Sequence, residues 1–218
     1  MVSLFSFALL FSPQLGWAHS YPDVAFNDVD FSAINHLSNL SIMTGSEDGQ
    51  FHPDLPLTRC ELLKISLLAN RQRPTGQYLP LTGNNGEPTG GESQSGFSDI
   101  RNGDWCDMYA NEMKYHRVIS GYPDGTFRPN QKVTQIEALK IIVNSLNTGV
   151  LPTTITTAAR YSDVNNSDWW SPYIQYVLDN NLTRGHDDTG YGISNVMSRR
   201  EAARVIYNIL QGYRYGPQ

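Results

Sequence analysis

The chain has 218 residues, enough for one domain of ordinary size or a short array of smaller units, and too few for a large multidomain enzyme. Hydrophobic residues make up 39% of it and charged residues 17%, which supports a folded core and excludes a disordered chain. The formal charge of −5, with 16 Lys and Arg, argues against binding nucleic acid through a general positive field.

The first element is an apolar segment at the N-terminus. Residues 2–11 are nearly all apolar, and Gly16 and Ala18 place small side chains at the −3 and −1 positions of a cleavage after Ala18. This pattern predicts a secretory signal peptide over residues 1–18, with a buried N-terminal helix or strand as the alternative. The run is shorter than the roughly 20 residues that a helix needs to cross a bilayer. We therefore expect an exported protein without a membrane span.

A repeated motif follows. The first unit, predicted at 26–70, begins with the sequence FNDV at 26–29. The same start recurs as FSDI at 97–100 and, 64 residues later, as YSDV at 161–164. In this alignment the first copy has 17 residues from its aspartate to its glycine where the others have 22. We interpret it as a copy that has lost the Trp segment.

Two linkers separate the three units. The second and third units are predicted at 96–147 and 160–211. Residues 71–95 are rich in Gly, Pro, Thr, Gln and Asn, which is typical of a surface excursion. The second linker, 148–159, is shorter and rich in Thr. A unit of about 50 residues has too little core to fold alone, so we expect the copies to pack together.

Each unit is predicted to contain two helices joined by a turn-rich loop. The aromatic and methionine spacing of the second copy, Trp105, Met108, Tyr109 and Met113, follows one face of a helix. The second helix of each unit starts with a hydroxyl residue followed three residues later by glutamate, a capping box. These pairs are Thr58 with Glu61, Thr134 with Glu137, and Ser198 with Glu201.

The order of these motifs resembles the S-layer homology (SLH) domain family in triplicate. The segment GYPDGTFRPN at 121–130 carries the resemblance most specifically. It implies a mainly α fold in which three helix-loop-helix repeats pack as a pseudo-threefold helical prism. It also implies attachment of exported proteins to cell-wall polysaccharide, often a pyruvylated polymer or a peptidoglycan-linked glycan, in grooves between repeats. The expected location is secreted, associated with the cell wall or S-layer.

Arginine at a helix start is the main candidate for ligand binding. Arg59 and Arg199 follow the capping residues at the first helical position, and the family resemblance assigns ligand contact to this arginine. A helix end with free N–H groups and a guanidinium fork beside it is suited to gripping a carboxylate or phosphate. A solvent-exposed or locally paired arginine is the alternative for both residues.

Further binding candidates are Trp170, Arg200 and Gln135. Trp170 is favoured for stacking on sugar, whereas core packing between repeats is at least as good an explanation for Trp105 and Trp169. Gln135 replaces the arginine in the second copy, so its groove is expected to be weak, altered or silent. A turn-organising role is expected for the motif aspartates Asp28, Asp99 and Asp163, and capping explains the glutamates.

The sequence predicts a non-catalytic module that binds an acidic cell-wall polysaccharide, with no metal and no cofactor. A structural envelope protein acting through self-assembly or protein contacts is the alternative, and a wall-polysaccharide hydrolase is a remote one. The two cysteines, Cys60 and Cys106, lie in neighbouring repeats. Export permits a disulfide between them, and two free thiols is the other alternative.

Overall fold

The computed structural model describes residues 21–73, 95–146, 151–156, 160–183 and 189–215. The predicted signal peptide, most of the first predicted linker and part of the second lie outside these ranges. Within them, no helix has the length and apolar character to cross a membrane.

Six helices form three pairs among the described residues. The first helices of the pairs are α1 (Phe31–Asn39), α3 (Asp107–Tyr115) and α5 (Ser171–Asp179). The second helices are α2 (Arg59–Asn70), α4 (Gln135–Ser145) and α6 (Arg199–Tyr215). Strand-like pairing in the described part of the chain is confined to three isolated bridges. The prediction of a mainly α fold is confirmed.

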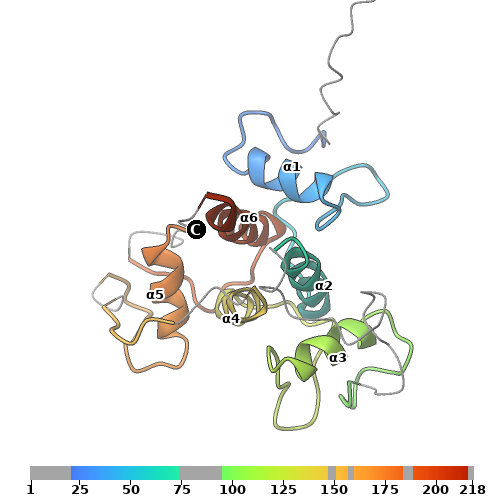
Figure 1. The fold of residues 1–218 in the computed structure, drawn as a ribbon, viewed down its shortest axis with the longest axis vertical. Helices are drawn as coiled ribbons and strands as arrows, with labels where there is room; N and C mark the ends of the chain where they lie inside the picture. Colours follow the sequence, from blue (N-terminus) through green and yellow to red (C-terminus); the bar gives the residue numbers. More distant parts are fainter. Residues whose placement is uncertain (1–20, 74–94, 147–150, 157–159, 184–188, 216–218) are drawn as a thin grey trace, which may run out of the picture.

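The second helices lie together at the centre of the molecule and the first helices lie outside them as three lobes (Figure 1). Each first helix packs against the second helix of another repeat, since α3 contacts α2, α5 contacts α4, and α1 contacts α6. The pairing is therefore cyclic, because the first repeat rests on the third. This confirms the expectation that the units pack against one another.

A ring of backbone hydrogen bonds joins the three repeats. The N–H of Leu57 donates to the carbonyl of Met197, that of Met197 to Val133, and that of Val133 to Leu57, over 2.9–3.0 Å. All three side chains are fully buried. Each of these residues directly precedes a capping residue, so the ring fixes where the three central helices begin.

The central helices start with reciprocal capping. The side chain of Thr58 accepts from the N–H of Glu61, whose carboxylate accepts from the N–H of Thr58. The same exchange is present at the starts of α4 and α6. Two of the four orphan N–H groups that each helix end exposes are thereby satisfied within the motif.

An aspartate in each repeat ties the loop before the second helix to the start of the unit. In the second repeat, Asp99 accepts from the N–H groups of Phe127 and Arg128 at 2.8 and 2.7 Å. In the third repeat, Asp163 accepts from those of Tyr191 and Gly192 at 2.7 and 2.8 Å. In the first repeat this residue is Asp23, which accepts from Phe51 and His52 at 2.9 and 2.6 Å. Asp28 is therefore not the equivalent of Asp99. It accepts from the N–H of Asp30 at 2.8 Å in the turn before α1, which agrees with the turn-organising role expected for it.

The corrected alignment of the first repeat begins at Tyr21. Its ring is 9% exposed and lies 5.3 Å from Phe51, as Phe97 lies 5.4 Å from Phe127. Phe26, which opens the more family-like sequence FNDV, is 86% exposed. From Asp23 to Gly45 there are 22 residues, as in the other copies. The first repeat is therefore not shortened, and Val29 stands in the position of the missing tryptophan.

The three joints between repeats use different chemistry at equivalent positions. The equivalent positions are the residue before each first helix and the second residue of the neighbouring central helix. At the α3–α2 joint these are Cys106 and Cys60, which form a disulfide. At the α1–α6 joint they are Asp30 and Arg200, which form an ion pair of 3.4 Å. At the α5–α4 joint the corresponding residues are apolar, Trp170 and Ile136, and both belong to the packed interior.

The disulfide joint yields a stability prediction. Replacing both Cys60 and Cys106 by alanine should lower the free energy of unfolding by about 2–4 kcal/mol, because the bond closes a loop in the unfolded chain. Urea denaturation measures this loss. Reductant should produce a similar loss in the wild type and none in the double variant. Two reactive thiols in the denatured, unreduced wild type would contradict the bond.

Candidate functional site

A small cavity lies where parts of all three repeats meet. Its volume is about 130 Å³. The lining residues that carry its chemistry are Arg59, Gly121, Tyr122, Glu137, Lys140 and Trp169. We call it the Arg59 cavity. Arg59 comes from the start of α2, the residues from Gly121 to Lys140 come from the loop and central helix of the second repeat, and Trp169 precedes α5.

Arg59 forms an inner wall of this cavity. Its Nε donates to the carbonyl of Phe127 at 2.8 Å, and its Nη1 donates to Glu137 at 3.1 Å. The guanidinium carbon lies 4.9 Å from the ring centre of Tyr122 and 4.6 Å from that of Phe127. The residue is 6% exposed. Arg59 therefore holds the second repeat's loop in place as well as bringing a positive charge to the cavity.

The N–H groups at this helix end are occupied. The N–H of Arg59 donates to Gln131 and that of Cys60 donates to Pro129, at 2.9 and 3.0 Å. The interpretation that free N–H groups would grip an anion is therefore wrong, because the neighbouring repeat already uses them. Nη2 of Arg59 has no hydrogen bond to any described residue. The charge available to a ligand comes from the side chain and not from the helix end.

Glu137 is the carboxylate of the cavity, and its bonds are made within the protein. Tyr122 donates its hydroxyl hydrogen to Oε1 at 2.8 Å, and the Thr134 N–H donates to Oε2 at 3.2 Å. Burial acts to raise the pKa of Glu137. The hydrogen bonds from Tyr122 and Thr134 and the charge of Arg59 outweigh burial, so the pKa lies below its usual value. Glu137 is therefore ionised at neutral pH and offsets one of the two cations.

Lys140 and Trp169 form the accessible side of the cavity. The Lys140 ammonium lies 5.0 Å from the Trp169 ring centre, within the range of a cation–π contact. No carboxylate of the described residues pairs with Lys140. Trp169 is 52% exposed. The Trp169 ring also contacts the rings of Trp170 and Tyr173, at centroid distances of 5.3 and 6.4 Å. The pair thus offers a positive charge without an internal carboxylate partner in the described part of the chain, beside a half-exposed aromatic ring.

Arg199 has the same internal role at another joint. Its Nε donates to the carbonyl of Phe51 and its Nη2 to that of Thr44, both at 2.8 Å. The guanidinium carbon lies 4.4 Å from the Phe51 ring centre. Burial lowers the pKa of Arg199 from its usual value. Arg59 and Arg199 are locally paired arginines, and Arg59 also lines the Arg59 cavity.

The remaining candidates lie elsewhere. Trp170 is partly buried against the core, while its neighbour Trp169 lines the Arg59 cavity. Arg200 pairs with Asp28 at 3.1 Å and with Asp54 at 2.7 Å. These carboxylates neutralise its charge at the α1–α6 joint. Gln135 is 4% exposed, and its Nε2 has no hydrogen-bond partner among the described residues. None of these three lines the Arg59 cavity.

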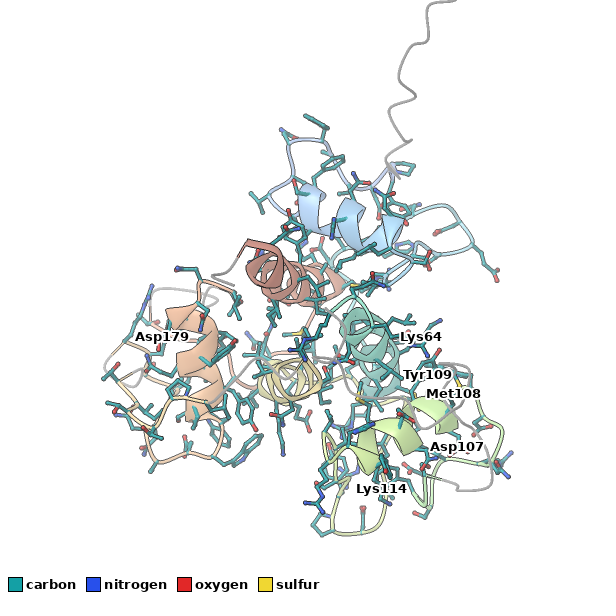
Figure 2. All side chains as sticks on the ribbon, in the orientation of Figure 1. Lys64, Asp107, Met108, Tyr109, Lys114 and Asp179 are labelled. Carbon is teal, nitrogen blue, oxygen red and sulfur yellow. A yellow bond between two sulfur atoms is a disulfide. The ribbon has the colours of Figure 1, made fainter. Side chains whose placement is uncertain are left out.

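Lys140 was not among the candidates predicted from the sequence, and core packing was at least as good an explanation for Trp169 as a binding role. A signal for the lysine was present. A cation follows the capping glutamate by three residues in all three repeats, as Lys64, Lys140 and Arg204. That spacing places it one turn along the same helix face. Figure 2 shows Lys64 on the side of α2 where α3 lies.

The Glu137 network predicts a pH dependence of stability. Because its folded pKa is lowered, its contribution is present above the unfolded pKa and is lost as the pH falls through the folded pKa. Glu137→Gln should cost about 1–3 kcal/mol of unfolding free energy at pH 7. The cost should shrink on acidification, as measured by urea denaturation. Glu61→Gln, at the exposed capping position, is the control. A pH-independent cost would contradict the account.

Several characterised proteins are similar to this chain. An S-layer protein of Bacillus thuringiensis subsp. finitimus is 23% identical over 89% of the chain and 22% of its own length. A cellulosome-anchoring protein of Acetivibrio thermocellus is 29% identical over 66% of the chain and 31% of its own length. The exoglucanase XynX of Acetivibrio thermocellus is 27% identical over 86% of the chain and 16% of its own length. The chain thus spans less than a third of each relative.

The family model of the S-layer homology domain matches three times. The matches cover residues 21–63, 96–139 and 160–203, more than half of the chain. The first match begins at Tyr21, where the structure begins the first repeat. The chain belongs to the S-layer homology domain family and contains three tandem repeats.

Proposed function

We propose that the chain is a non-catalytic anchoring module that binds an acidic cell-wall polysaccharide through the Arg59 cavity. The observation that carries the proposal is the combination of two cations, Arg59 and Lys140, with the half-exposed ring of Trp169 around one hollow. An aromatic face can stack on a sugar ring. The adjacent cations are placed to meet a carboxylate on that sugar.

The charge of the cavity supports an acidic ligand. Glu137 offsets one cation and is committed to Tyr122, Thr134 and Arg59. The charge of Lys140 remains without an internal carboxylate partner in the described part of the chain. A bound carboxylate would supply that partner without breaking the network around Glu137. A pyruvyl ketal, which the family resemblance implies, is one carboxylate-bearing substituent that suits this arrangement.

A location at the cell surface follows from the family. S-layer homology repeats mark proteins of the cell wall and surface layer, and the relatives include an S-layer protein and a cellulosome-anchoring protein. Because the chain corresponds to a small part of each relative, what it anchors is a separate question from how it is anchored.

The chemistry of the Arg59 cavity supports binding rather than hydrolysis. Glycoside hydrolysis commonly needs two carboxyl groups about 5–10 Å apart on either side of the scissile bond. The Arg59 cavity has one carboxylate among its lining residues, Glu137, and its lowered pKa makes it a poor proton donor at neutral pH. The similarity to an exoglucanase covers 16% of that protein's length, as a shared anchoring segment would.

Two single variants test the proposal. Lys140→Met and Trp169→Ala should each weaken binding to purified wall polysaccharide about tenfold, corresponding to roughly 1.4 kcal/mol. Both residues are at least partly exposed, so neither change should unfold the protein. Arg101→Met removes the same charge at an exposed site, and Tyr115→Ala removes an aromatic ring that is 68% exposed. These controls should bind like the wild type.

The same assay separates the alternatives. Removal of the polymer's acidic substituents should reduce wild-type binding to the level of Lys140→Met. Retention by intact walls but not by deproteinised polymer would instead indicate a protein partner, as expected of a structural envelope protein. Time-dependent release of reducing sugar would indicate a hydrolase. Equal binding by Lys140→Met, Trp169→Ala and the wild type would reject the Arg59 cavity as the site.

A further inference from the structure

A second cavity lies at the joint where the third repeat meets the first. Its volume is about 360 Å³, within the range of about 300–1,000 Å³ that is usual for small-ligand sites. It is lined by residues of α1 and α6, by the two residues before α1, and by residues that follow α5. The lining residues used below are Asp30, Ser32, Asn181, Arg204, Tyr207 and Asn208. We call it the Arg204 cavity.

The positive charge of this cavity is neutralised from within. Arg204 occupies the position of Lys140, but its Nε and Nη2 donate to the two oxygens of Asp30 at 2.6 and 2.7 Å. Asp30 is 1% exposed, so the pair is shielded on the carboxylate side. The hydrogen bond to Asp30 raises the pKa of Arg204. A ligand carboxylate would have to compete with a fork-to-fork ion pair that is already formed.

In the part of the chain that the structure describes, the second cation of the Arg59 cavity also has no counterpart here. The position of Arg59 is taken by Gln135 in the repeat that precedes this joint. Arg200, at the start of α6, is paired with Asp28 and Asp54. Among the described residues, the carboxylates around this joint outnumber the guanidinium groups. The electrostatics therefore disfavour the acidic ligand proposed for the Arg59 cavity.

The rest of the lining is uncharged and mostly polar, with one aromatic ring and the apolar side chains of Val29 and Ala33. Ser32, Asn181 and Asn208 bring a hydroxyl and two side-chain amides, of which that of Asn208 also donates to the carbonyl of Leu182 at 3.1 Å. Tyr207 stands where the first and second repeats have the buried aliphatic residues Leu67 and Val143. It is partly buried, with its ring 5.3 Å from that of His36. Amides and hydroxyls beside an aromatic ring suit a polyhydroxylated ligand.

We infer that the Arg204 cavity is a separate subsite for an uncharged sugar residue of the wall polysaccharide. The inference rests on the proposed function, because it assigns a second part of the same polymer to a second joint. The Arg59 cavity takes a carboxylate-bearing residue and the Arg204 cavity takes a neutral one. The module then recognises a polymer by two chemically different residues at two joints.

The test uses the full chain, labelled with nitrogen-15, and short fragments of wall polysaccharide. One set of fragments is untreated and the other is stripped of its acidic substituents. Stripped fragments should shift the amide signals of Ser32 and Asn208 and leave those of Gly121 and Lys140 in place. Untreated fragments should shift both groups of signals.

Two variants locate the subsite. Ser32→Trp fills the cavity mouth from an exposed position, and Tyr207→Val restores an aliphatic residue like those of the other repeats. Each should weaken binding of stripped fragments at least tenfold. Asn39→Trp, which adds the same bulk at the exposed end of α1, should bind them normally. Unperturbed signals in the rest of the spectrum will show that each variant is folded.

The outcomes for the two cavities are distinguishable. If stripped fragments shift no signal around Ser32 and Asn208, or bind Ser32→Trp and Tyr207→Val as well as the wild type, the neutral subsite is rejected. This holds whether or not untreated fragments bind at Lys140. If untreated fragments leave Lys140 unshifted while stripped fragments shift Ser32, the acidic site is rejected and the neutral subsite stands.

Discussion

The closed ring of backbone hydrogen bonds through Leu57, Val133 and Met197 is the constraint on which the other features depend. A single repeat cannot satisfy these groups or bury these side chains, because each partner belongs to another repeat. Closing the ring sets the start of all three central helices. It therefore places a residue of one repeat, such as Arg59, against the loop of the next. The cavities are a consequence of that closure, since their walls come from different repeats.

Local patterns made most of the fold predictable. The capping motifs located the central helices, and the repeated spacing indicated three units that must pack together. The alignment of the first unit was wrong because the sequence FNDV at 26–29 is more similar to the family motif than the true start, which begins at Tyr21. Burial distinguishes the two, since Tyr21 is 9% exposed and Phe26 is 86% exposed. The amino-acid sequence alone does not show which of these two aromatic residues is buried.

The site was less predictable because its chemistry depends on pairings between repeats. The position of Arg200 suggested a ligand contact, but its ion pairs with Asp28, Asp30 and Asp54 neutralise its charge. A single lysine on a helix does not by itself indicate a site, and the signal for Lys140 is that its position is cationic in every repeat. Equivalent joints have diverged to a disulfide, an ion pair and apolar packing. The divergence changes the charge of the adjacent cavities while the backbone ring is kept.

Native-state hydrogen exchange of the Leu57, Val133 and Met197 amides tests the central claim most directly. If the ring closes the three repeats into one cooperative unit, these amides exchange only through global unfolding. Their opening free energies should then be equal, and should match the unfolding free energy from denaturant. A lower opening free energy for one amide than for the other two would show that a repeat opens independently. That result would contradict a closed ring as the basis of the fold and its cavities.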